Sequence, residues 1–316
     1  MDDATYPLPH RPTSRGWVRA AALLGITMLT TVLHPTVLIA VPFLALILVM
    51  GARGMGTLVA AGLAGLIVFS GWNGGDSVWW MERGWAVLVG GCFVAETLRR
   101  PGTQFTSRAL LAVGGAVAVA AALLAWGPHA WPAVDWAVRQ RMMEGVGMAL
   151  DAITLVRGGQ AFSSVTVAAI YQTVEAQVQV FPAMVAISSM SALGVAWWFY
   201  RRLTAADGEA LGPLRDFRFN DHLVWVFIGG ILLMIVRWGD AFARVGANAV
   251  VFMGALYALR GAAVIVFLSG GLSLVGYILV ALGLVFMSPL ILAGAMVIGL
   301  GDTWFDVRTR IRDLAA

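Results

Sequence analysis

Charged side chains are scarce in this sequence of 316 residues: Asp, Glu, Lys and Arg together make up 12%, whereas hydrophobic residues make up 60%. Soluble domains carry about 25% charged residues. Apolar runs of about 17 to 25 residues recur along the chain, and each is long enough to cross a hydrocarbon core. The composition therefore excludes an ordinary water-soluble domain. It predicts an all-α fold, a polytopic transmembrane helical bundle.

Lysine is absent, so all 21 basic residues are arginines. They gather at the ends of apolar segments, as at Arg99 with Arg100 and Arg201 with Arg202, which is typical of the cytoplasmic flanks of membrane helices. This placement indicates contact with the lipid bilayer, including anionic lipid, and no nucleic-acid partner. Arginines near both chain ends predict a bacterial cytoplasmic-membrane protein with both termini in the cytoplasm.

Cysteine occurs once, at Cys92, which excludes an internal disulfide and a cysteine-based zinc or iron–sulfur site. The histidines fall in the N-terminal tail, in loops or at helix ends. The sequence contains no metal-protease histidine pair on one helix, no phosphate-binding loop with its lysine and no nucleophile elbow. We therefore expect no enzyme activity, no metal site and no cofactor.

Apolar runs, prolines and interfacial tryptophans divide the chain into five regions. Because cytoplasmic termini require an even number of spans, we expect about eight, within a range of about seven to ten. The count depends on whether the first apolar block holds a re-entrant pair and whether 245–300 holds three spans, with breaks at 269–271 and 288–289. The regions are a cytoplasmic tail (1–16), N-terminal transmembrane helices (17–132), an amphipathic interfacial helical region (133–180), C-terminal transmembrane helices (181–301) and a cytoplasmic amphipathic tail (302–316).

The middle region, 133–180, differs from the rest because charged and apolar side chains alternate along it at helical spacing. Such a pattern indicates a helix that lies along the membrane surface. After Gly158 and Gly159 a second segment carries Glu175 among several glutamines. This segment is either interfacial or lines a polar cavity, because a lipid-facing span would not carry these groups.

Arg260 is a cation inside the apolar run 247–268, where its charge costs about 2.5 to 3.5 kcal/mol at the bilayer centre. Tyr257, three residues earlier, shares its helix face, whereas Asn248 points elsewhere. Two interpretations are open: Arg260 reaches the headgroups or caps a neighbouring helix, or it is a functional intramembrane cation. The candidate counter-charges are Glu96, Glu175, Asp240 and Asp302.

Two motifs in the last third of the chain carry a family resemblance. Residues 248–261 open with Asn248 and reach Tyr257 and a glycine, and residues 300–308 contain Asp302 and end at Arg308. Together they resemble the YybS-like family, uncharacterised prokaryotic membrane proteins that share a domain of unknown function. The resemblance extends more loosely over 17–312. The family often has a glutamine where this chain has Arg260, so a neutral polar contact becomes a charge.

The resemblance implies a shared architecture and supplies no established activity. It also implies a likeness to the helical bundles of substrate-binding subunits from energy-coupling-factor vitamin transporters. Genes of the family often lie near ribosomal-protein genes, which implies a housekeeping or envelope role. From the residues themselves, the six-residue spacing of Asp302 and Arg308 predicts a structural salt bridge or cap at a helix end.

Two functions are compatible with these observations. The first is a small-solute binding or transport subunit that lacks its own nucleotide site, relies on an energising ATPase module, and binds its solute at Glu175, Asn248, Tyr257 and Arg260. The alternative is a non-catalytic membrane scaffold in an envelope or division complex, with 133–180 and 203–221 as docking surfaces. A binding subunit requires polar residues that converge on one cavity, whereas a scaffold would place them at a rim or an exposed groove.

Overall fold

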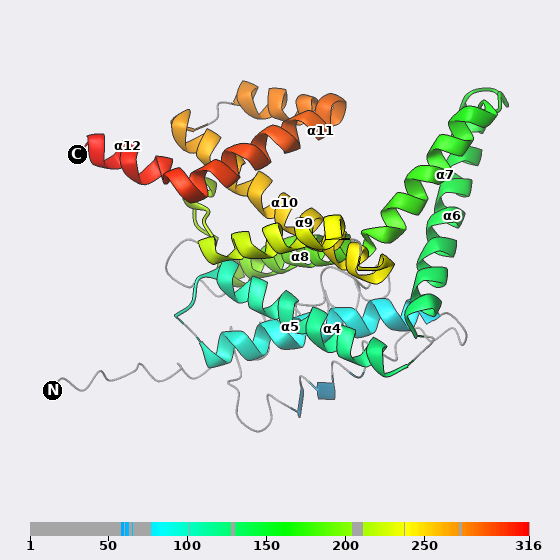
Figure 1. Ribbon diagram of the computed structural model, residues 1–316, viewed down its shortest axis with the longest axis horizontal. Helices are drawn as coiled ribbons and strands as arrows, with labels where there is room; N and C mark the ends of the chain where they lie inside the picture. Colours follow the sequence, from blue (N-terminus) through cyan, green and yellow to red (C-terminus); the bar gives the residue numbers. More distant parts are fainter. Residues whose placement is uncertain are drawn as a thin grey trace. The chain divides into compact units, whose positions relative to one another are not determined.

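The computed structural model describes residues 58–59, 61–62, 65, 77–100, 102–127, 130–203, 211–236, 238–271 and 274–315. Within these residues every regular element is a helix, which confirms the predicted all-α fold. Figure 1 shows their order along the chain. The helices are α4 (Ser77–Arg99), α5 (Phe105–Trp126), α6 (Ala130–Val156), α7 (Ser164–Gln179), α8 (Phe181–Leu203), the 3-10 turns η1 (Leu214–Asp216) and η2 (Asp221–Leu223), α9 (Val224–Val236), α10 (Asp240–Leu268), α11 (Leu274–Phe305) and α12 (Val307–Ala315).

Several of these helices are long and apolar enough to cross a membrane. In the described part of the chain they are Phe105–Trp126, Phe181–Trp198 and Asp240–Leu268, and the bent pair Pro289–Phe305 with Val307–Asp313 raises the total from three to four. A helical membrane protein is therefore supported. The predicted count of about eight spans is not confirmed, and the helices expected in 17–71 lie almost entirely outside the described residues.

The chain forms two compact units. The first contains Met1–Val134 and Ser188–Leu211, and the second contains Asp135–Ile187 and Gly212–Ala316. Helices α6 and α8 each cross from one unit into the other.

In the first unit, α4 packs along α5 because small residues line the contact. Ala109, Ala112 and Ala116 recur at spacings of three and four on α5 and are fully buried, so the two backbones approach closely. The C-terminal part of α8 joins this pair through aromatic contacts. Phe93 of α4 and Trp197 of α8 have ring centroids 5.9 Å apart. These rings, with the buried Arg108 guanidinium 4.9 Å from the centroid of the Trp197 ring, form the core of the described part of the first unit.

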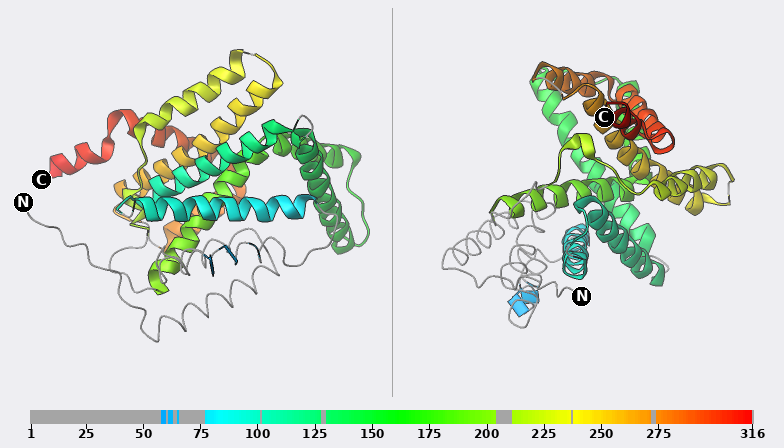
Figure 2. Two further views of the ribbon diagram at one scale, coloured as in Figure 1. Left: turned by 90° about the horizontal axis from the view of Figure 1, so that it is seen from below. Right: turned by 90° about the vertical axis from the view of Figure 1, so that its left-hand side faces the viewer.

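In the second unit, α10 is the central helix, and α9 and α11 pack against it (Figure 2). Glycines allow both close approaches. A Cβ on Gly261 of α10 would overlap the carbonyl oxygen of Ala295 on α11, and a Cβ on Gly299 would overlap the carbonyl oxygen of Tyr257. Nearer the start of α10, Gly246 meets Gly230 of α9 in the same way. The glycines of α10 therefore set how closely its neighbours pack.

The chain after α10 breaks at both positions that the sequence marks. Gly270 and Gly271 adopt φ values of +68° and +113° in the turn between α10 and α11, which favours glycine. Within α11, Met287 leaves the helical conformation (φ −133°, ψ 31°) just before Pro289. Proline disfavours the helical conformation in the residues that precede it. The run 245–300 is thus interrupted at both predicted breaks, but three spans within it are not confirmed.

Helices α6 and α7, with the turn 157–163, make an antiparallel pair that we call the α6–α7 hairpin. On α7 the least exposed residues, Val167, Ile170, Val174 and Val178, recur at spacings of three and four and make one apolar face. The side chain of Ser163 caps α7 by accepting a hydrogen bond from the Thr166 amide at 3.2 Å. The predicted amphipathic region therefore forms two helices, and they are separated at the predicted break after Gly158 and Gly159.

Candidate functional site

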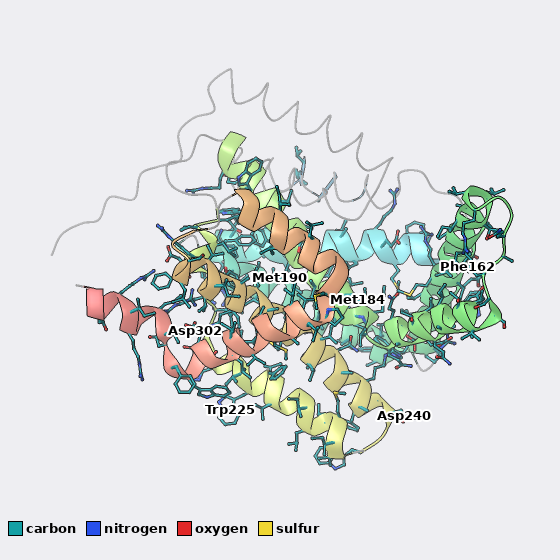
Figure 3. All side chains as sticks on the ribbon, turned by 90° about the horizontal axis from the view of Figure 1, so that it is seen from above. Phe162, Met184, Met190, Trp225, Asp240 and Asp302 are labelled. Carbon is teal, nitrogen blue, oxygen red and sulfur yellow. The ribbon has the colours of Figure 1, made fainter. Side chains whose placement is uncertain are left out.

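The strongest candidate site begins on the face of α10 that contacts α11. Met253, Tyr257, Arg260 and Val264 recur at spacings of three and four and are nearly fully buried. Because Gly261 brings α11 close, the long Arg260 side chain reaches the last turn of α11, where it bonds the side chain and the carbonyl oxygen of Asp302. Figure 3 shows Asp302 there, where α11 leads toward α12.

Arg260 is held from two sides by carboxylates. Its Nε donates to Oδ2 of Asp302 at 2.9 Å, and its Nη2 donates to the Asp302 carbonyl oxygen at 3.3 Å. Its Nη1 donates to Oδ1 of Asp221, in η2, at 2.5 Å. The Arg260 side chain is 2% exposed, whereas that of Asp221 is 62% exposed. One partner is therefore buried with the arginine, and the other faces the surface.

A second arginine shares the buried carboxylate. Arg308 of α12 donates from Nη2 to Oδ2 of Asp302 at 2.8 Å and from Nη1 to the carbonyl oxygens of Arg215 and Phe217 at 2.9 and 3.0 Å. Oδ2 of Asp302 thus accepts from both arginines. Its Oδ1 is buried and has no hydrogen-bond partner among the described residues. We call Asp221, Arg260, Asp302 and Arg308 the ion cluster.

Aromatic rings make the apolar wall of the ion cluster. The Arg260 guanidinium carbon lies 5.5 Å from the centroid of the Phe219 ring. Phe219 and Phe227 both contact Tyr257 edge-on, with ring centroids 5.2 and 5.8 Å from that of Tyr257. Tyr257 is itself fully buried. The rings exclude water from the guanidinium and strengthen its ion pairs.

Exposed ion pairs surround the cluster and fasten α12 to the segment 211–223. Arg218 donates to Asp306 at 2.7 Å, and Arg312 donates to Asp216 at 2.6 Å. The described part of the predicted loop, 211–221, and of the predicted tail, 302–315, therefore meet at the same end of the second unit. This is the placement required if both lie on one side of the membrane.

Asn248 and Glu175 lie elsewhere. Asn248 donates from Nδ2 to the carbonyl oxygens of Gln179 and Arg244, both at 2.9 Å, and its Oδ1 accepts from the Ala183 amide at 2.8 Å. It joins the end of α7 and the start of α8 to α10. Twelve residues separate it from Arg260, which is about 18 Å along the helix. Glu175 pairs with Arg139 of α6 at 3.0 Å, with both side chains about half exposed.

The structure thus brings together Tyr257, Arg260, Asp302 and Arg308 from the predicted sites. Of the proposed counter-charges to Arg260, Asp302 is the partner, and Asp302 and Arg308 are in contact across the bend at Asp306. Glu96 lies 3.9 Å from Arg100 on its own helix, as expected of a local pair. Asp221 was not among the predicted counter-charges of Arg260. In the sequence it is the last residue of a polar loop, and no local pattern links it to α10.

The α6–α7 hairpin meets the opposite end of α10. Arg244 there grips Asp135 of α6 with two hydrogen bonds, at 2.5 and 2.7 Å, and donates to the Val178 carbonyl oxygen of α7 at 3.2 Å. Sixteen residues of α10 separate Arg244 from Arg260, about 24 Å of helix. That is close to the thickness of a hydrocarbon core, about 30 Å. The hairpin base and the ion cluster therefore lie near opposite ends of this candidate span.

The ion cluster is a charge-balanced group of two arginines and two aspartates. The guanidinium of Arg260 forms ion pairs with the buried carboxylate of Asp302 and with the solvent-exposed carboxylate of Asp221. Among the described residues no group of three or more histidine, cysteine, aspartate or glutamate side chains is arranged to hold a metal ion. The guanidinium of Arg260 can bind an oxyanion where Asp221 now binds it.

Comparison with known proteins adds no identification. No family model matches the chain, and neither a curated protein nor a solved structure matches it. The resemblance to the YybS-like family stays a prediction.

Proposed function

We propose that this protein is a small-solute binding or transport subunit of the bacterial cytoplasmic membrane, and that the ion cluster with Tyr257 is its binding centre. The observation that supports this is the burial of Arg260, Asp302 and Arg308, each 2% exposed or less, at the end of an otherwise apolar bundle. Ionised residues within membrane helices are costly and commonly mark substrate or ion pathways.

Stability alone is a poor reason for such a cluster. Taking ions out of water costs several kcal/mol per ion, and well-packed apolar residues often stabilise a fold as much or more. Four charges from η2, α10, α11 and α12 meet here, although α10 and α11 already pack through glycine contacts. A requirement other than packing explains their presence.

The proposed function also concerns the family of this protein and the source of energy for transport. Residues 248–261 and 300–308, which resemble the YybS-like family, contain Tyr257 and three of the four charges of the ion cluster, so we also propose that the chain belongs to that family. The sequence has no phosphate-binding loop with its lysine. Transport would therefore need a separate energising ATPase module, and the cytoplasmic surface formed by 211–223 and α12 is its proposed docking place.

Affinity purification from native membranes in mild detergent tests this function, with mass spectrometry of bound small molecules and co-purifying proteins. We expect the wild-type protein to carry a stoichiometric metabolite and Arg260→Gln to lose it. Arg312→Gln is the matched control, because Arg312 is an exposed arginine of the same surface and pairs with Asp216 outside the cluster. An equal loss in both variants, or no metabolite in the wild type, would contradict the proposal.

The second candidate is the membrane scaffold of an envelope or division complex, and one observation favours it. Beyond its attachment to α10, the α6–α7 hairpin exposes large apolar side chains near its turn: Leu155, Val156 and Val165 are 79%, 88% and 76% exposed. Figure 3 shows Phe162 at this tip. Exposed apolar groups of this kind mark protein or membrane contacts. Recovery of envelope-assembly proteins without a metabolite, and their loss with Leu155→Ser, would favour this function.

A further inference from the structure

Asp221 is the point at which the ion cluster meets the surface. Its carboxylate bonds a guanidinium that is almost fully buried, yet its own side chain is mostly exposed. The other carboxylate on Arg260, that of Asp302, is completely buried. The Nη1 side of Arg260 is therefore covered from outside by one surface carboxylate.

We propose that Asp221 occupies an oxyanion site on Arg260, and that a small solute carrying a carboxylate or phosphate group binds there by displacing it. This inference rests on the proposed binding function and names the chemical class of its ligand. The displaced carboxylate moves into water, where it is readily solvated.

Arg260 stays in place when Asp221 leaves. Its Nε and Nη2 remain bonded to the side chain and carbonyl oxygen of Asp302, and Phe219 lies against the guanidinium. Asp302 is itself held by Arg308. The cation is thus fixed before the ligand arrives, which lowers the entropy cost of binding, and Nη1 keeps its donors directed toward the surface.

Charge balance favours an anion at this position. With Asp221 in place, two arginines face two aspartates, and the ion cluster has no net charge. Removing the Asp221 carboxylate leaves one net positive charge beside apolar rings, where it is poorly solvated. Arginine forms strong charge-assisted hydrogen bonds to carboxylate and phosphate oxygens alike, so both groups fit the vacated donors.

The backbone around Asp221 does not depend on its carboxylate. The turn η2 is capped by Asn220, whose side-chain oxygen accepts a hydrogen bond from the His222 amide at 3.0 Å. Rotation of the Asp221 side chain can therefore free Arg260 without unwinding the turn. The substitution Asp221→Ala should likewise leave the fold intact.

The test measures the thermal unfolding midpoint of the full-length protein in detergent against concentration of inorganic phosphate or acetate, at constant ionic strength with chloride. An intramolecular carboxylate competes as a tethered ligand at high effective concentration. We expect Asp221→Ala to bind phosphate or acetate saturably and at least about tenfold more tightly than the wild type. Asp216→Ala, which removes an exposed carboxylate paired with Arg312 in the same segment, should behave as the wild type.

A second set of measurements identifies the source of the oxyanion. The same variants are compared in nanodiscs of phosphatidylcholine alone and with added phosphatidylglycerol. Selective stabilisation of Asp221→Ala by phosphatidylglycerol, without an effect of free phosphate or acetate, assigns the site to a lipid headgroup, and the reverse assigns it to a soluble solute. Equal responses of Asp221→Ala and Asp216→Ala to all of these anions would overturn the inference.

The inference and the proposed function can fail separately. If Asp221→Ala binds phosphate while no metabolite co-purifies from native membranes, the oxyanion site stands and the transport function does not. If a metabolite co-purifies but carries no anionic group, the function stands and the oxyanion site is wrong.

Discussion

Removal of the Asp302 charge is the most informative perturbation of the second unit. Asp302→Asn keeps the shape of the side chain and leaves Arg260 and Arg308 buried, with only the exposed Asp221 to balance them. Breaking a buried ion pair by removing one partner costs about 3 to 5 kcal/mol. The two pairs share one oxygen, so their costs are not additive. We therefore expect a single loss within that range.

The assay is thermal unfolding in detergent, followed by the fluorescence of the 13 tryptophans. A loss of this size lowers the midpoint by about 6 to 20 °C for a domain of this size. Asp216→Asn is the control, because its pair with Arg312 is exposed and worth at most about 1 kcal/mol. Adding Arg308→Met to Asp302→Asn should restore part of the lost free energy of unfolding, because it removes one buried cation that has lost its carboxylate partner.

Equal midpoints for Asp302→Asn and Asp216→Asn would refute the reasoning. They would mean that water reaches the ion cluster and solvates Arg260 and Arg308 when the Asp302 charge is absent. A double variant less stable than Asp302→Asn alone would show that the methylenes and backbone contacts of Arg308, rather than its charge, dominate at this position.

Three further predictions concern packing and topology. Gly261→Ala should destabilise the second unit by at least about 1 to 3 kcal/mol in thermal unfolding, because its Cβ would meet α11 backbone, whereas Gly294→Ala, with open space at its Cβ, should be neutral. Asn248→Ala should cost about 1 to 3 kcal/mol in the same assay, since it removes the side-chain partner of the Ala183 amide and of the Gln179 carbonyl oxygen. In a cysteine-free background, cysteines at Arg215 and Gln179 should react with a membrane-impermeant thiol reagent from opposite sides of the membrane; labelling of both from one side would contradict this. Gln179 contacts Asn248 near the start of α10, whereas Arg215 contacts α12, which lies over Phe267 near the end of α10.

Local patterns predicted a good part of the second unit. The glycines at 270–271 and the proline at 289 marked the breaks around α11, since each residue type restricts or permits backbone conformations wherever it occurs. Arg260 was recognisable as unusual because a charge in an apolar run is costly in any fold. Asp302 and Arg308 were recognisable as a pair because six residues of helix and bend bring them together.

Local sequence patterns could not identify which carboxylates pair with Arg260. Four carboxylates were candidates, and the choice of Asp302 depends on α11 crossing α10 at Gly261 and Gly299, 38 residues apart in the chain. Glu175 was grouped with Arg260 for its polarity alone, yet it pairs with Arg139 on the hairpin. Polarity along the chain indicates that a residue needs a partner, but it does not indicate which one.

The sequence by itself determined that the protein is helical with apolar helices long enough to cross a membrane, and it singled out an arginine that requires compensation. These properties follow from composition, spacing and the cost of charge in an apolar environment. Only the tertiary structure decided that Asp302 and Asp221 provide the compensation, one completely buried and the other mostly exposed. That difference depends on how the segment 211–223 and α12 fold against α10. It is also what turns a buried ion pair into a candidate binding site.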